Sequence, residues 1–197
     1  MKRDLDKLME KHGYDGMLIT GPAGHNPAMF YYLGPVHFGH GDVIHKKGAE
    51  PIVFYNPMER EEAQKAGYPS QNLAEFKFNE LLKANDNDYV KATAQRYKKQ
   101  FEHAGLTKGR VVLYGKYEIG NQFAVYSELQ KLMPGLELVG EVNDSMLMEA
   151  MATKDEDEAV RMRAMADLTM EVVGRTWEFL AGHKAKDEVL VKADGEA

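Results

Sequence analysis

The sequence feature that most constrains the fold is a long amphipathic helix near the C-terminal end. Thr153 can accept hydrogen bonds from the first free amides, and Glu156 can complete a capping box, so we expect the helix to begin there. Gly182 is the predicted stop signal. Between them one helical face carries Ala159, Met162, Ala166, Thr169, Val173, Trp177 and Leu180. A stripe of this length needs a surface to cover it, and few residues follow.

Composition narrows the class of protein. The 197 residues exceed a typical single domain and fall short of two full-sized ones. The absence of cysteine excludes disulfides, thiolate nucleophiles and cysteine metal sites, and it fits the cytoplasm, where we expect the protein. A net charge of -6 gives no general attraction to phosphate backbones, so nucleic acid is not an expected partner. No apolar run is long enough for a bilayer, and we expect no membrane contact.

Predicted strands and helices alternate along the first 140 residues. Short apolar runs predict strands at residues 16–20, 43–46, 51–55, 111–114 and 136–139. Helical patterns cover residues 3–12, 27–32, 58–66, 88–104 and 120–133. The second and third strands are separated by a four-residue turn, which predicts an antiparallel hairpin. The pattern predicts an α/β fold, a mixed five- to six-stranded sheet with helices on both faces, followed by the long C-terminal helix.

No motif in the chain is a catalytic signature in its own right. The sequence lacks a phosphate-binding loop, a nucleophile elbow and a helical pair of zinc-binding histidines. The nearest approach to a metal site is His37, His40 and His45, with Asp42 among them. Strand alternation would send Asp42 and His45 to opposite faces of the sheet, which weakens this interpretation. A solvated histidine-rich loop is the alternative.

Two segments carry a resemblance to a known family. Residues 15–20 read DGMLIT, and they are followed by Asn26 and by YYLG at residues 31–34. This order resembles the N-terminal domain of the creatinase, prolidase and aminopeptidase P family. Residues 154–164, KDEDEAVRMRA, are similar to the family's junction with its catalytic domain. Met151 and Leu33 depart from the family pattern, which has an arginine and a threonine there.

The resemblance implies a creatinase N-terminal, ribonuclease H-like domain over residues 1–150. Residues 151–197 would then be the junction helix and the start of a truncated catalytic domain. The aspartates, histidine and glutamates that bind a dinuclear manganese, cobalt or zinc centre lie beyond Ala197 in the family pattern. We therefore expect no catalytic residue, metal ligand or cofactor in this chain. We interpret Asp15, Asp42, Asp144 and the glutamates of the last helix as turn, cap and surface residues.

The function that the resemblance implies is that of a non-catalytic domain of a Xaa-Pro-type metallopeptidase. Such a domain contributes to a homodimer and to active-site access, while its own catalytic domain hydrolyses the bond before proline. Phe38 and His40 are the candidates for a substrate-proximal loop, and a flexible exposed loop is the alternative. Two other hypotheses stay open: a stand-alone binding module that kept the fold, and the N-terminal domain of a creatinase- or lyase-type relative.

Overall fold

The computed structural model describes residues 2–192, apart from the side chains of Lys2 and Asp144. The chain divides into two compact units, residues 1–152 and 153–197, of which the last five residues lie outside the described part. No helix within the described range is both long and apolar enough to cross a membrane.

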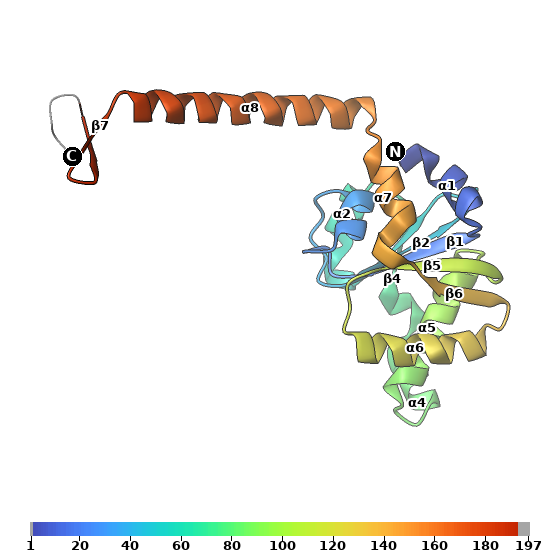
Figure 1. The fold of residues 1–197 in the computed structure, drawn as a ribbon. Coiled ribbons are helices and arrows are strands. Elements are labelled where there is room, and N and C mark those ends of the chain that lie inside the picture. The colour runs from blue at the N-terminus through green and yellow to red at the C-terminus, as the bar shows by residue number, and fades with distance from the viewer. Residues whose placement is uncertain (1, 193–197) are drawn as a thin grey trace. The chain divides into compact units, whose positions relative to one another are not determined.

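A mixed six-stranded sheet forms the centre of the first unit (Figure 1). Its strands are β1 (Gly16–Gly21), β2 (Gly41–Lys46), β3 (Ile52–Tyr55), β4 (Ser70–Asn72), β5 (Gly109–Gly115) and β6 (Leu136–Gly140). Their order is β4-β3-β2-β1-β5-β6. The pairs β1–β2 and β2–β3 are antiparallel, whereas β1–β5, β5–β6 and β3–β4 are parallel. The predicted hairpin and the five- to six-stranded mixed sheet are confirmed.

Helices cover both faces of this sheet (Figure 1). The elements are η1 (Lys2–Asp4), α1 (Leu5–His12), α2 (Pro27–Leu33), η2 (Pro57–Glu59), α3 (Arg60–Lys65), η3 (Leu73–Phe76), α4 (Phe78–Ala84), α5 (Tyr89–His103), α6 (Ile119–Leu132), η4 (Val142–Asp144) and α7 (Ser145–Ala152). Successive strand residues point to opposite faces, so Met17 and Ile19 join the core under α1, α2 and α7. Leu18 and Ile44 join the core under α5 and α6.

The second unit contains α8 (Glu156–Ala181) and a hairpin of β7 (Lys184–Lys186) and β8 (Val189–Val191). The prediction that Thr153 caps α8 is wrong by two residues. Asp155 is the N-cap: its carboxylate accepts from the amide of Glu158, and the Glu158 carboxylate accepts from the amide of Asp155, both at 3.0 Å. Thr153 and Asp155 are both followed by a Glu three residues later, so the sequence pattern fits either cap. Because α7 extends to Ala152, the chain first has to leave that helix, and the cap falls at Asp155. Gly182 ends α8 as predicted.

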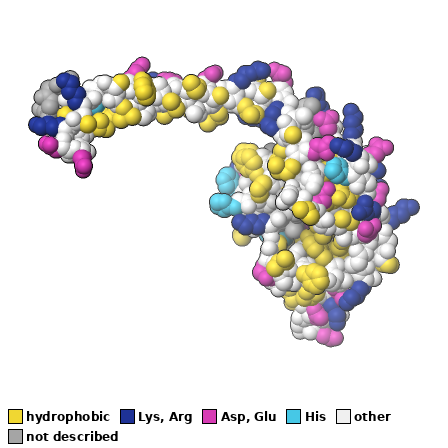
Figure 2. Space-filling model, viewed as in Figure 1, with side chains coloured by type: hydrophobic (Ala, Val, Ile, Leu, Met, Phe, Trp, Pro, Cys, Tyr) yellow, Lys and Arg dark blue, Asp and Glu magenta, His cyan; other side chains and the backbone are white. Residues whose placement is uncertain are grey.

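Hydrophobic side chains of α8 are exposed along its length (Figure 2). No residue of α8 is buried, and the most exposed large apolar side chain of the helix is Trp177 at 73%. The second unit by itself therefore does not cover the predicted stripe.

Candidate functional site

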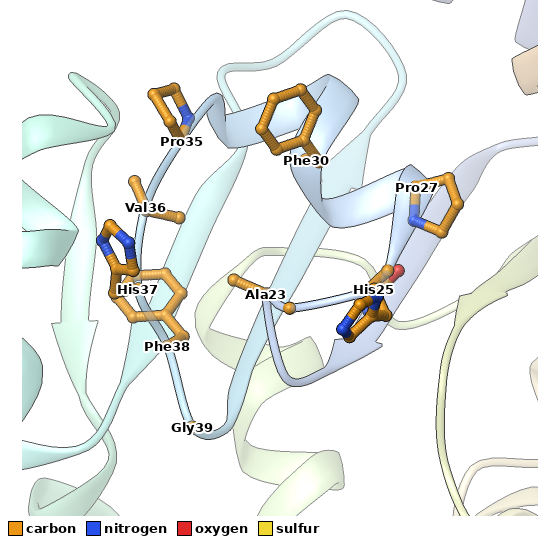
Figure 3. A pocket seen from close by; sticks show the side chains of 11 residues that line it. Ala23, His25, Pro27, Phe30, Pro35, Val36, His37, Phe38 and Gly39 are labelled. Atoms are coloured by element: carbon orange, nitrogen blue, oxygen red, sulfur yellow. The ribbon is translucent and has the colours of Figure 1, made fainter. Parts of the chain in front are cut away.

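A hollow of about 910 Å³ lies where the loop after β1, helix α2 and the loop after α2 meet. It is lined by residues 23–27, Phe30 and residues 35–39, and we call it the loop hollow (Figure 3). This is the region in which the sequence placed the substrate-proximal loop. Residues alternate along its outer wall: Val36 and Phe38 are buried, whereas His37 is exposed.

Asn26 fixes the backbone on the side of the loop hollow that is formed by the end of β1 and the start of α2. Its side-chain amide donates to the carbonyl oxygen of Thr20 at 3.0 Å, and its Oδ1 accepts from the amide of Met29 at 3.3 Å. The residue thus ties the end of β1 to the first turn of α2, with Pro27 at the first helical position, where its missing N–H has no cost. The amide of Ala23 also donates to the carbonyl of Phe38 at 2.9 Å, which joins the two walls.

The outer wall is held by two glutamates that precede and begin α3. The amide of His37 donates to Glu62 at 2.9 Å, and the amide of Gly39 donates to Glu59 at 2.5 Å. A hydrogen bond from Lys65, followed by the one from the His37 amide, lowers the pKa of Glu62 to about 2. The loop is therefore anchored by its backbone, and its one exposed imidazole, His37, lies 3.4 Å from Glu62.

The two predicted substrate-proximal residues lie in different surroundings. Phe38 is only 4% exposed and belongs to the core under α2, so it supports the wall of the loop hollow. His40 does not line the hollow: its Nε2 lies 3.8 Å from Asp42, and its ring meets Tyr117 edge-on with a centroid separation of 5.6 Å. His25, Phe30 and His37 are the exposed aromatic side chains of the hollow, and the contact with substrate stays a prediction.

The three histidines of the candidate metal site do not converge. His37 lies beside Glu62, His40 turns toward Asp42, and His45 contacts Tyr32 and Asp6 on the other face of the sheet. In the part of the chain that the structure describes, no three His, Asp or Glu side chains are placed to hold a metal ion. The histidines and carboxylates of residues 2–192 whose side chains are described therefore do not fit a dinuclear metal centre.

His45 is instead a buried structural residue. Its Nδ1 and the hydroxyl of Tyr32 form a hydrogen bond of 2.5 Å, and its Nε2 lies 3.4 Å from Asp6. Burial lowers the pKa of His45, and this effect is opposed by the nearby Asp6 and by a backbone hydrogen bond with Ala49. Burial likewise raises the pKa of the Tyr32 phenol. The contact joins β2 to α1 and α2.

The burial of Asp42 differs most from the sequence interpretation, which grouped this residue with turn, cap and surface residues. Its side chain is fully buried because β2 is a central strand and Asp42 points toward α5. Its Oδ1 accepts from the hydroxyls of Thr20 at 2.5 Å and Tyr97 at 3.1 Å, and its Oδ2 accepts from Gln100 at 3.0 Å. Burial, and then the charge of Asp42, raise the pKa of Tyr97. Asp15 is a turn residue as predicted, accepting from the amide of Arg110.

Parts of several solved peptidase structures have a similar fold. A dipeptidase from Pyrococcus horikoshii matches with a TM-score of 0.55 and 14% identity over 87% of this chain and 43% of its own. A prolidase from Thermococcus sibiricus matches with a TM-score of 0.56 and 15% identity over 90% of this chain and 44% of its own. An X-Pro aminopeptidase from Thermotoga maritima matches with a TM-score of 0.53 and 13% identity over 81% of this chain and 38% of its own.

These likenesses establish the fold. The chain has the fold of the matching parts of prolidase and X-Pro aminopeptidase chains, which is the fold expected from the creatinase and prolidase resemblance. It spans about two fifths of the length of each. No curated protein and no family model matches the sequence.

Proposed function

We propose that this chain is the non-catalytic N-terminal domain of a Xaa-Pro-type metallopeptidase, with the beginning of its catalytic domain from residue 151. The observation that carries the proposal is the fold likeness to three peptidase chains, each of which is more than twice as long as the part matched. The family motifs at residues 15–34 and 154–164 add to it independently. The intact protein would hydrolyse the peptide bond that precedes proline.

The loop hollow gives this domain its role in active-site access. Its exposed aromatic rings, His25, Phe30 and His37, offer an apolar surface with two imidazoles to a molecule outside the domain, and the backbone of His37 is anchored by a hydrogen bond. Such a surface suits contact with the apolar ring of a prolyl substrate held by a neighbouring subunit. The proposal therefore includes a homodimer in which each loop hollow faces the partner's catalytic domain, and the cytoplasm as its compartment.

A dinuclear manganese, cobalt or zinc centre would belong to the catalytic domain of the intact protein. When bound, such a centre supplies a metal-activated water for hydrolysis. Among the residues that the structure describes, no three histidine or carboxylate side chains are placed to hold a metal ion, so none of these is assigned to that centre.

Hydrolysis of a Xaa-Pro dipeptide by the chain, with added manganese or cobalt, tests the first part of the proposal. The expected result is no turnover above a metal-only control, and turnover above it would overturn the assignment. The coding sequence after codon 197 tests the second part. An open frame containing two aspartates, a histidine and two glutamates is expected, whereas an immediate stop codon would favour the stand-alone binding module.

The role of the loop hollow is tested in the intact protein. We expect His37→Ala to raise KM for a Xaa-Pro dipeptide and to leave kcat nearly unchanged, because the residue touches substrate and not the reacting atoms. His103→Ala, at the end of α5, is the matched control and should change neither constant. Turnover of creatine or of a sulfonium compound by the intact protein, with no peptidase activity at all, would instead assign the parent to a creatinase- or lyase-type relative.

A further inference from the structure

The sheet has a topological switch point between β1 and β5. These two strands are parallel neighbours, yet the chain leaves β1 for α2, which packs on one face, and leaves β5 for α6, which packs on the other. The two loops separate at the carboxyl ends of the strands and leave a crevice between them. In open α/β sheets such a crevice is the usual place for a ligand.

A pocket of about 510 Å³ lies at this point, and we call it the β1–β5 pocket. It shares no lining residue with the loop hollow. Its rim carries Tyr117, Ile119 and Phe123, whose side chains are 45%, 83% and 74% exposed. Among the described residues, its lining contains no Asp, Glu, Lys or Arg. An apolar, partly aromatic rim without charge favours an uncharged ring over an ionic ligand.

The backbone keeps the pocket open where the strands end. Gly115 and Gly140 both line it, and neither has a side chain to fill it. Gly115 has a φ of 125°, and a Cβ at this position would overlap the carbonyl oxygen of Thr20. Only glycine allows β1 and β5 to approach so closely here.

The floor of the pocket presents hydrogen-bond acceptors. Thr20 is 3% exposed, and its only proton is donated to Asp42. Tyr97 donates its proton to Asp42 as well, so its oxygen accepts from the Nε2 of Gln122 at 3.4 Å. What Thr20 and Gln122 can still offer to a ligand are the oxygen lone pair of the hydroxyl and the amide Oε1. A ligand that donates a hydrogen bond therefore finds two acceptors, Thr20 and Gln122, on this floor.

In the described part of the chain, the buried hydrogen-bond network around Asp42 contains polar atoms without partners. Gln100 is fully buried and donates to Asp42, but its Oε1 has no hydrogen-bond partner in the described part of the chain. The Nε2 of His40, on the other side of Asp42, also lacks one there. Buried polar atoms without partners are uncommon in native proteins and often mark a ligand or water site. Here they belong to the network whose outer members, Thr20 and Gln122, line the pocket.

We propose that the β1–β5 pocket binds a small uncharged aromatic molecule with one hydrogen-bond donor, of the indole or phenol type. The ring lies against Tyr117 and Phe123, and its N–H or O–H points to Thr20 and Gln122. The proposal does not depend on the peptidase assignment, because none of these residues belongs to the loop hollow.

The test uses the ¹⁵N-labelled full chain and indole as the probe. Titration followed by NMR should give saturable shifts at Gly115, Tyr117 and the side-chain amide of Gln122. Phe123→Ala should weaken binding by about five-fold, which corresponds to roughly 1 kcal/mol, the middle of the range for an aromatic pair. Phe179→Ala is the matched control, because Phe179 is 60% exposed in the other unit, and it should leave the affinity unchanged.

The role of the ligand's hydrogen-bond donor is tested separately with benzofuran, which has the shape of indole and an oxygen in place of the N–H. Benzofuran should bind more weakly than indole to the wild type, and Gln122→Leu should remove this difference. Tryptamine and indole-3-acetate should bind no more tightly than indole, because no charge lines the pocket. The proposal is overturned if no saturable shifts occur, if Phe123→Ala binds indole like the wild type, if either charged analogue binds more tightly, or if benzofuran matches indole. It is equally overturned if the residues around Phe123 respond only to protein concentration, which would make this surface a contact between copies.

Discussion

The side-chain amide of Gln100 donates a 3.0 Å hydrogen bond to Oδ2 of Asp42, and neither residue is exposed. The bond connects the middle of α5 to a central strand, and Thr20 and Tyr97 complete the set of donors around the same carboxylate. A buried carboxylate with three donors is costly to disturb, because any lost partner leaves a polar group without hydrogen bonds in the core.

The first prediction is that Asp42→Asn destabilises the chain by about 3 kcal/mol. The asparagine must point its NH₂ group at either the Gln100 amide or the two hydroxyls, so that donors face each other. Urea unfolding followed by far-UV circular dichroism measures the loss. Asp86→Asn is the control, since Asp86 is exposed at a φ of 52° that asparagine tolerates. Equal stabilities of the two variants would contradict the buried network.

A second prediction concerns the close approach of β1 and β5. Gly115→Ala should cost about 2 kcal/mol or more, because the added Cβ meets the backbone of Thr20 at a φ that alanine rarely adopts. Gly140→Ala is the matched control at the end of β6, where a Cβ would have no neighbour within 4 Å. If both variants unfold at the same urea concentration, the strand ends do not approach as described.

Much of the fold could be predicted from local sequence patterns. The strands at residues 16–20 and 43–46 and the hairpin that continues to Tyr55 were recognisable because apolar runs are bounded by glycine and proline. Other elements carry no such pattern. Strand β4 has the sequence SQN, and it forms because β3 offers it a free edge and not because its residues prefer a strand.

The hydrogen-bond network around Asp42 was harder to predict, because it too depends on contacts between distant parts of the chain. Gln100 lies on the buried face of α5, but a glutamine at a helical position usually faces solvent, so the sequence contains no signal that it meets Asp42. The contact joins residues 58 positions apart and appears only when α5 packs on the sheet. The separation of His37, His40 and His45 could be anticipated in part, because strand alternation sends Asp42 and His45 to opposite faces.

A third prediction concerns the pH dependence of stability. Burial lowers the pKa of His45 in the folded chain below its ordinary value of 6.5, so the unfolded chain binds more protons between the two values. The stabilising contribution is therefore complete above about pH 6.5 and is lost as the pH falls through the folded pKa. Urea unfolding at pH 7.5 and 5.5 should show a smaller loss for His45→Asn than for the wild type.

The control for this experiment is His37→Asn. The side chain of His37 is 86% exposed, so its replacement should leave the loss between the two pH values as in the wild type. A pH dependence that is unchanged in His45→Asn would show that the buried imidazole is not its source.

A fourth prediction separates the two possible caps of α8. Asp155→Ala removes the acceptor for the amide of Glu158 and should destabilise the first turn by about 1 kcal/mol, which corresponds to roughly five-fold faster amide exchange there. Hydrogen exchange of residues 156–159 measures this change. Thr153→Ala is the control and should have little effect on these amides. The opposite ranking would restore the cap predicted from sequence.

The last prediction uses Trp177, the only tryptophan of the chain, as a reporter on the exposed stripe of α8. With 73% of its surface exposed, Trp177 should emit at the wavelength of tryptophan in water and be quenched by acrylamide nearly as well as a free tryptophan amide. Apolar stripes of this length are normally covered in a complete assembly, so the measurement is repeated over a range of chain concentrations. Emission that moves to shorter wavelengths as the concentration rises would assign the cover to a second copy and support the proposed homodimer. Short-wavelength emission that is independent of concentration would mean that Trp177 is covered within a single chain, and it would contradict this prediction.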